Sequence, residues 1–124
     1  MKRLAWIAIL GAALACLDNS PNGGVLKVNL TTPNSGGDGA ILLTVSGPDV
    51  LVSAVPAGGL RLFTQPLATT NEVALTGTLR SGTILTIEVP DLGKASAYTA
   101  TIQQVATPSY GLRTLTGYSL KVAP

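Results

Sequence analysis

Few side chains in this 124-residue chain have the chemistry of a reactive group, because it contains one Cys, Cys16, and no His. The absence of His excludes a histidine general base, a Ser-His-Asp triad and a Cys/His zinc cluster. The glycines and serines match neither a Gly-x-Ser-x-Gly nucleophile elbow nor a phosphate-binding loop. We therefore expect no catalytic residue and no cofactor. Cys16 is left as the one side chain whose type predicts a covalent reaction.

The segment from Asn34 to Gly39 (NSGGDG) is a candidate calcium loop, since it combines an amide, a carboxylate and flexible glycines. Its spacing differs from that of an EF-hand loop, and Asp38 is its single carboxylate. The same residues are those that a hairpin turn requires, because Asn, Asp and Gly accept positive φ and form local hydrogen bonds. We expect a turn without metal, with Asn34 and Asp38 as the candidate ligands if calcium binds.

Glu88 and Asp91 are the closest pair of carboxylates, separated by Val89 and Pro90. A glycosidase needs two carboxylates that face one glycosidic bond. Here Glu88 is expected on the outer face of a strand and Asp91 in the turn after Pro90. We expect a solvated strand end, and a carboxylate-based hydrolase is the remote alternative.

Three tyrosines are candidate recognition residues, because exposed tyrosines are effective anchors at interfaces. Tyr98 is in phase with Ile102, and Tyr118 is in phase with Leu120, so both are expected in the core. Tyr110 stands between Ser and Gly in a predicted loop. It is the candidate binding residue.

The N-terminus has the pattern of an export signal. Basic residues Lys2 and Arg3 precede an eleven-residue apolar stretch, 4–14, and Ala15 stands directly before Cys16. The apolar run through Leu17 has 14 residues, fewer than the roughly 20 that span a bilayer as a helix. We predict a helical signal peptide over residues 1–15, with cleavage between Ala15 and Cys16.

The residues around the cleavage site, Ala13-Leu14-Ala15-Cys16, resemble the lipobox of bacterial lipoproteins. The resemblance implies that the Cys16 thiol is alkylated with diacylglycerol, the signal is cut before it and the new amine is acylated. It also implies an outer-membrane address, because Leu17, and not the Asp that marks inner-membrane retention, follows the Cys. The same small-x-small pattern fits general signal peptidase. A secreted or periplasmic protein without lipid is therefore the alternative.

The charge balance argues against a nucleic-acid partner. The whole chain carries eight basic and six acidic residues, and removal of Lys2 and Arg3 with the signal leaves equal numbers. Arg61, Arg80 and Arg113 are far apart in sequence without interleaved aromatic residues. The expected attachment is to the membrane through the lipid, and a protein or glycan partner is left open.

After the predicted tether, 16–24, the chain has the pattern of an all-β domain over residues 25–124. It is 46% hydrophobic, too apolar for a disordered tail, and its Val, Leu, Ile and Thr runs are broken by Gly, Pro, Asn and Asp. About eight strands are predicted, over 25–31, 40–46, 50–55, 60–64, 72–76, 83–89, 95–105 and 115–122. They favour two packed antiparallel sheets, with a small barrel as the alternative.

Three stretches resemble strands of cohesin-like bacterial β-sandwich domains, namely 38–47 (DGAILLTVSG), 72–77 (EVALTG) and 81–89 (SGTILTIEV). The resemblance implies a single immunoglobulin-like or cohesin-like sandwich. Together these patterns predict an envelope lipoprotein whose sandwich acts as a non-catalytic structural or binding module.

Overall fold

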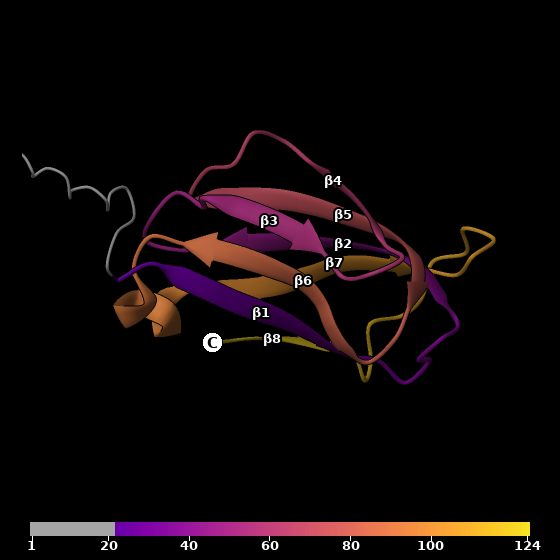
Figure 1. Cartoon of the computed structure of the whole chain (residues 1–124). Helices are drawn as coiled ribbons and strands as arrows, with labels where there is room; N and C mark the ends of the chain where they lie inside the picture. Colours follow the sequence, from indigo (N-terminus) through magenta and orange to yellow (C-terminus); the bar gives the residue numbers. More distant parts are fainter. Residues whose placement is uncertain (1–21) are drawn as a thin grey trace, which may run out of the picture.

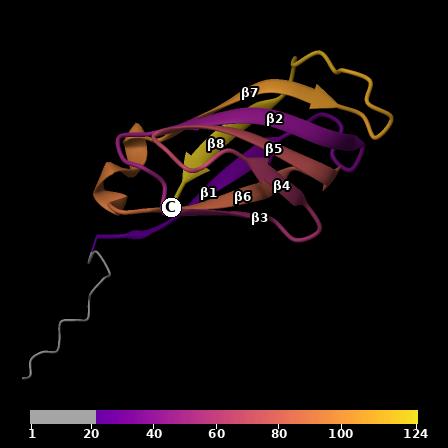
Figure 2. The ribbon, with the colours of Figure 1, turned by 90° about the horizontal axis from the view of Figure 1, so that it is seen from above.

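The computed structural model describes residues 22–124, which form two antiparallel four-stranded sheets packed face to face (Figures 1 and 2). The predicted signal peptide, its cleavage site between Ala15 and Cys16, and most of the tether lie outside the described residues. The strands are β1 (Gly24–Thr31), β2 (Asp38–Ser46), β3 (Ser53–Pro56), β4 (Arg61–Thr64), β5 (Thr70–Leu79), β6 (Gly82–Val89), β7 (Thr99–Ala106) and β8 (Ser119–Ala123). Within the described part, no helix is long and apolar enough to cross a membrane.

The strand order confirms the predicted sandwich. One sheet, here called the β1 sheet, has the order β3-β6-β1-β8, and the other, the β2 sheet, has the order β4-β5-β2-β7. Every strand pair is antiparallel. Among these eight strands no pairing joins the two sheets, so they form a sandwich and not a closed barrel.

The core lies between the sheets and is built by alternation along each strand. Leu26 of β1 is paired with Ile87 of β6, and Leu43 of β2 with Val73 of β5, and all four are buried. Such side chains contribute about 1.5–3 kcal/mol each on burial. The aliphatic alternation that predicted the strands therefore also identifies the inner faces.

The strand predicted over 50–55 begins three residues late, at Ser53, and those predicted over 95–105 and 115–122 each begin four residues late. The last two have a clear local cause. Residues Leu92–Ala97 form a 3₁₀ helix, η2, because the Asp91 carboxylate accepts a hydrogen bond from the Gly93 N–H at 2.9 Å. The last strand begins at Ser119, because Gly117 has a φ of +85° and turns the chain before it. In one case the Asp91 cap starts a 3₁₀ helix where the strand was expected, and in the other the turn at Gly117 delays the strand.

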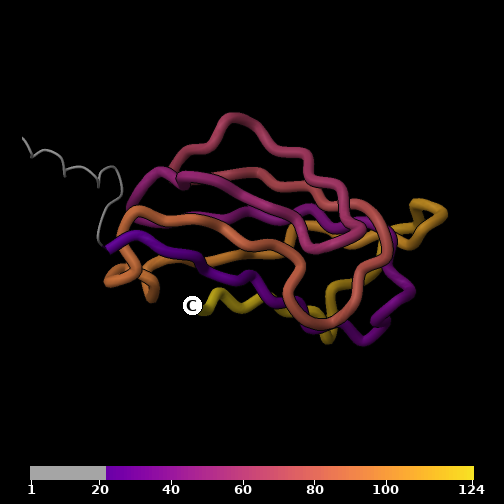
Figure 3. Tube along the Cα trace, viewed as in Figure 1, coloured from indigo at the N-terminus to yellow at the C-terminus, as the bar shows by residue number. Residues whose placement is uncertain are grey.

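The two ends of the sandwich differ in what they carry (Figures 1 and 3). The chain enters at the end that carries η2, where the Leu92 N–H donates to the Asn22 carbonyl at 2.7 Å. The same end carries the β2–β3 loop, joined to η2 by an ion pair between Lys94 and Asp49. The β1–β2 loop and the long β7–β8 connection, 107–118, lie at the opposite end.

Candidate functional site

Asp38, the first residue of β2, is 1% exposed and is held by three side chains from two segments. Its Oδ1 accepts hydrogen bonds from the Arg113 Nε at 3.0 Å and the Tyr118 hydroxyl at 2.9 Å. Its Oδ2 accepts from the Thr32 hydroxyl at 2.7 Å. Buried charges are tolerated when they are paired and hydrogen-bonded, and Asp38 is both. The carboxylate therefore ties the β1–β2 loop to the β7–β8 connection.

The two candidate calcium ligands lie in this cluster. The Asn34 side chain donates its Nδ2 to the Tyr118 hydroxyl oxygen at 2.9 Å, and Asp38 faces hydrogen-bond donors. Over residues 22–124, no three Cys, Asp or Glu side chains are grouped to hold a metal. Asp38 accepts hydrogen bonds from Thr32, Arg113 and Tyr118, and calcium would have to displace these donors.

The β7–β8 connection is fixed against the β2 sheet by further bonds. Arg113 donates its Nη2 to the Gly37 carbonyl at 3.1 Å and its backbone N–H to the Val105 carbonyl at 2.8 Å. Leu112 forms an isolated bridge with Ala106 at the end of β7. Leu112 is 70% exposed at the rim of the sheet, so its position is set by backbone contacts and not by burial.

Tyr110 lies at the tip of this connection, as predicted, and its side chain is 85% exposed. Its φ of +70° places it in the left-handed region, which costs a residue with a side chain about 1–3 kcal/mol. The turn is closed by hydrogen bonds between Thr107 and Gly111 and from the Tyr110 N–H to the Thr107 carbonyl. The fold thus holds an aromatic ring in solvent at some cost in strain.

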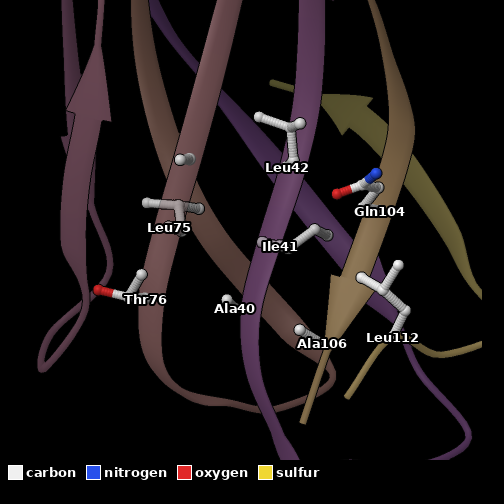
Figure 4. A pocket seen from close by; sticks show the side chains of 9 residues that line it. Ala40, Ile41, Leu42, Leu75, Thr76, Gln104, Ala106 and Leu112 are labelled. Carbon is white, nitrogen blue, oxygen red and sulfur yellow. The ribbon is translucent and has the colours of Figure 1, made fainter. Parts of the chain in front are cut away.

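The outer face of the β2 sheet is depressed near this loop, because small side chains occupy its centre. The strand register aligns two rows across the sheet, Phe63, Ala74, Leu42 and Gln104 in one and Arg61, Thr76, Ala40 and Ala106 in the next. Leu42, Thr76 and Leu112 surround the short side chains of Ala40 and Ala106 (Figure 4). This first hollow has a volume of about 260 Å³.

A second hollow of about 420 Å³ continues the first, sharing Ala40 and Thr76 with it. Phe63, which is 54% exposed, and Tyr110 both line it. Among the residues that the structure describes, Asp38 is the one charged residue that lines it, and its charge is countered by Arg113. We call the two connected depressions the Phe63–Tyr110 hollow.

A polar row borders the hollow on the same sheet. Gln103 donates its Nε2 to the Thr44 hydroxyl at 2.8 Å and to the Glu72 carboxylate at 3.3 Å. These bonds run from β7 to its neighbour β2, and across β2 to β5, on the outer face. Glu72 of this network also lines a further depression beside Leu42 and Phe63.

The other carboxylates considered from sequence have local roles. Glu88 is exposed on the outer face of the β1 sheet and accepts a hydrogen bond from the Ser53 hydroxyl at 3.2 Å. Asp91 caps η2. Glu88 and Asp91 therefore each form a hydrogen bond with a different group.

Sequence reasoning missed the partners of Asp38 and, in the hollow, Phe63. A register shift between Asp38 and Ala40 breaks the alternation of β2, so the pattern did not indicate that Asp38 is buried. Arg113 and Tyr118 lie 75 and 80 positions away from it in sequence. The position of Phe63 could have been predicted from the sequence, because the alternation through Leu62 places the Phe63 side chain on the outer face of the sheet.

Comparisons of this chain with protein-family models, with curated proteins and with solved structures found no match.

Proposed function

We propose that this protein is a bacterial envelope lipoprotein that carries a non-catalytic β-sandwich binding module. The proposal is supported by the chain's only Cys, which follows the lipobox-like residues Ala13-Leu14-Ala15. Seven residues, 17–23, lie between Cys16 and Gly24, where β1 begins, and the eight steps from Cys16 to Gly24 reach about 25–30 Å when extended. Such a tether holds the sandwich close to a bilayer.

The observation that carries the binding role is the placement of the hollow relative to the tether. β1 begins at the end of the sandwich that carries η2, whereas Tyr110 and Leu112 belong to the connection at the opposite end (Figure 1). A module anchored at its first strand therefore directs these side chains away from the membrane. Exposed apolar side chains on a rigid scaffold are typical of binding surfaces.

The anchor needs no contribution from the sandwich. Each buried CH₂ of an acyl chain contributes about 0.8 kcal/mol, so one chain binds reversibly and two or three bind firmly. The resemblance to lipoproteins favours the outer membrane. A secreted or periplasmic protein without lipid is the competing function, because general signal peptidase accepts the same site.

Metabolic labelling with palmitate in a bacterial host tests the anchor. The full chain should incorporate label and enter the membrane fraction, and Cys16→Ser should do neither. A matched control, Cys16→Ser combined with Ser20→Cys, keeps one thiol four positions away and should stay unlabelled. Label in either variant, or none in the unaltered chain, would overturn lipidation at Cys16.

A further inference from the structure

We propose that the Phe63–Tyr110 hollow binds an uncharged glycan, with sugar rings packed on the two aromatic side chains. This inference rests on the proposed role as a binding module and is independent of lipidation. The larger depression measures about 420 Å³, within the range of roughly 300–1,000 Å³ for ligand sites. Its continuation past Ala40 and Thr76 provides room along the sheet for a chain of sugars.

The residues that line the hollow offer both the apolar surfaces and the polar groups that a sugar ring contacts. A pyranose presents C–H groups on its faces and hydroxyls at its edge. The exposed rings of Phe63 and Tyr110 offer large apolar surfaces for the faces. Thr76 and Gln104 line the hollow with a neutral hydroxyl and a neutral amide that suit the edge.

The charge of the hollow selects against ionic ligands. Asp38 is its one charged lining residue, and the Arg113 guanidinium already occupies Oδ1 at 3.0 Å. No Lys or Arg is among the described residues that line the two depressions, and Arg61 beside Thr76 and Arg80 beside Gly36 lie outside this lining. A phosphate or carboxylate buried in the hollow would therefore be unpaired by its lining, which is costly. An uncharged ligand avoids this cost.

A second copy of the chain fits the hollow less well. Symmetric dimers bring the same patch of both subunits together, so the two depressions would face each other. The volume between them would stay unfilled, and packed interfaces require complementary surfaces. The concave shape therefore favours a small or linear ligand.

The hollow is also preorganised. The hydrogen bonds around Asp38 fix the connection that carries Tyr110, and the positive φ of Tyr110 is held by its own closed turn. A rigid site loses less conformational freedom when it binds. Asp38 and Arg113 thus act as positioning residues.

Calorimetric titration of the purified full chain with two probes, cellohexaose and chitohexaose, tests the inference. We expect saturable binding of at least one probe below about 10 mM. Phe63→Ala and Tyr110→Asn should each weaken it about tenfold. Asn accepts positive φ, so Tyr110→Asn removes the ring without disturbing the turn. Tyr110→Phe keeps the ring and should bind within about threefold of the unaltered chain.

The matched control is Val55→Ala, on the outer face of the β1 sheet, where Val55 is 54% exposed like Phe63. It should leave binding unchanged. Absence of saturable binding by both probes, or binding unaffected by both ring variants, would overturn the glycan inference. Capture of an apolar peptide at Phe63 without sugar binding would also overturn it, yet would leave the binding module standing. Palmitate labelling reports separately on the anchor.

Discussion

The hydroxyl of Tyr118 lies 2.9 Å from Oδ1 and 3.1 Å from Oδ2 of Asp38 and donates its proton to this carboxylate. Tyr118 directly precedes β8 in the β1 sheet, and Asp38 begins β2 in the other sheet. The contact therefore connects the two layers across the end of the sandwich. It also fixes one end of the connection that presents Tyr110, so stability and the candidate binding surface depend on the same carboxylate.

Loss of this hydroxyl should destabilise the fold. Tyr118→Phe removes a donor to a buried carboxylate and also the oxygen that accepts from Asn34. We expect a decrease of about 1.5–3 kcal/mol in the free energy of unfolding, measured by urea denaturation. Tyr110→Phe is the control, since that ring is exposed, and should change stability by less than about 0.5 kcal/mol. Equal effects of the two substitutions would show that the Asp38 contact is not stabilising.

Loss of the cation should have a larger structural effect on the loop. Arg113→Met leaves Asp38 without its paired charge and removes the bond to the Gly37 carbonyl. Because the Arg113 side chain is 30% exposed, we expect a loss of about 2–3 kcal/mol, below that of a fully buried pair. Arg113→Met combined with Asp38→Asn should recover part of this loss. A double variant that is less stable than Arg113→Met would contradict the pairing.

The sequence was sufficient for the sandwich, because aliphatic alternation determines both the strands and their inner faces. It predicted Tyr110 as an exposed loop residue from its Ser and Gly neighbours. It could not locate the hollow, because the depression depends on which strands are neighbours and on their register. The Asp38 cluster was equally hidden, since it joins residues up to 80 positions apart and follows a break in the alternation of β2.

Tyr98→Phe should not destabilise the fold, in contrast to Tyr118→Phe. Tyr98 is 3% exposed, and its hydroxyl has no hydrogen-bond partner among the described residues. An unsatisfied buried hydroxyl is destabilising, so Tyr98→Phe should leave stability unchanged or raise it by up to about 1 kcal/mol at pH 7. Urea denaturation checks this. A loss above about 1 kcal/mol would mean that the hydroxyl makes a favourable contact.

The pKa shift of Tyr98 also predicts that the stability of the fold depends on pH. Burial, and secondarily the charge of Asp49, raises the pKa of Tyr98 in the folded chain. Above pH 10 the unfolded chain releases this proton first, so stability should fall as pH rises toward the folded-state pKa. Below pH 10 both states keep the proton and the effect is absent. Tyr98→Phe should lose less stability than the unaltered chain between pH 9 and pH 11, and an identical decline would contradict the shift.

Gly47 and Tyr98 pack so closely that a methyl group should not fit between them. A Cβ on Gly47 would overlap the Tyr98 ring, whereas one on Gly58 would meet no atom of residues 22–124 within 4 Å. Gly47→Ala should therefore cost about 1–3 kcal/mol through overpacking. Gly58→Ala should be neutral within about 0.5 kcal/mol. Thermal unfolding of both variants compares them, and an equal stability would argue against the tight contact.

The intact mass of the mature protein, purified from the membranes of a bacterial host, tests the proposed anchoring most directly. The account predicts a chain that begins at Cys16 and carries the added mass of a diacylglyceryl group, with or without a further acyl chain. A mature chain that begins at another residue, or that begins at Cys16 with an unmodified thiol, would contradict it.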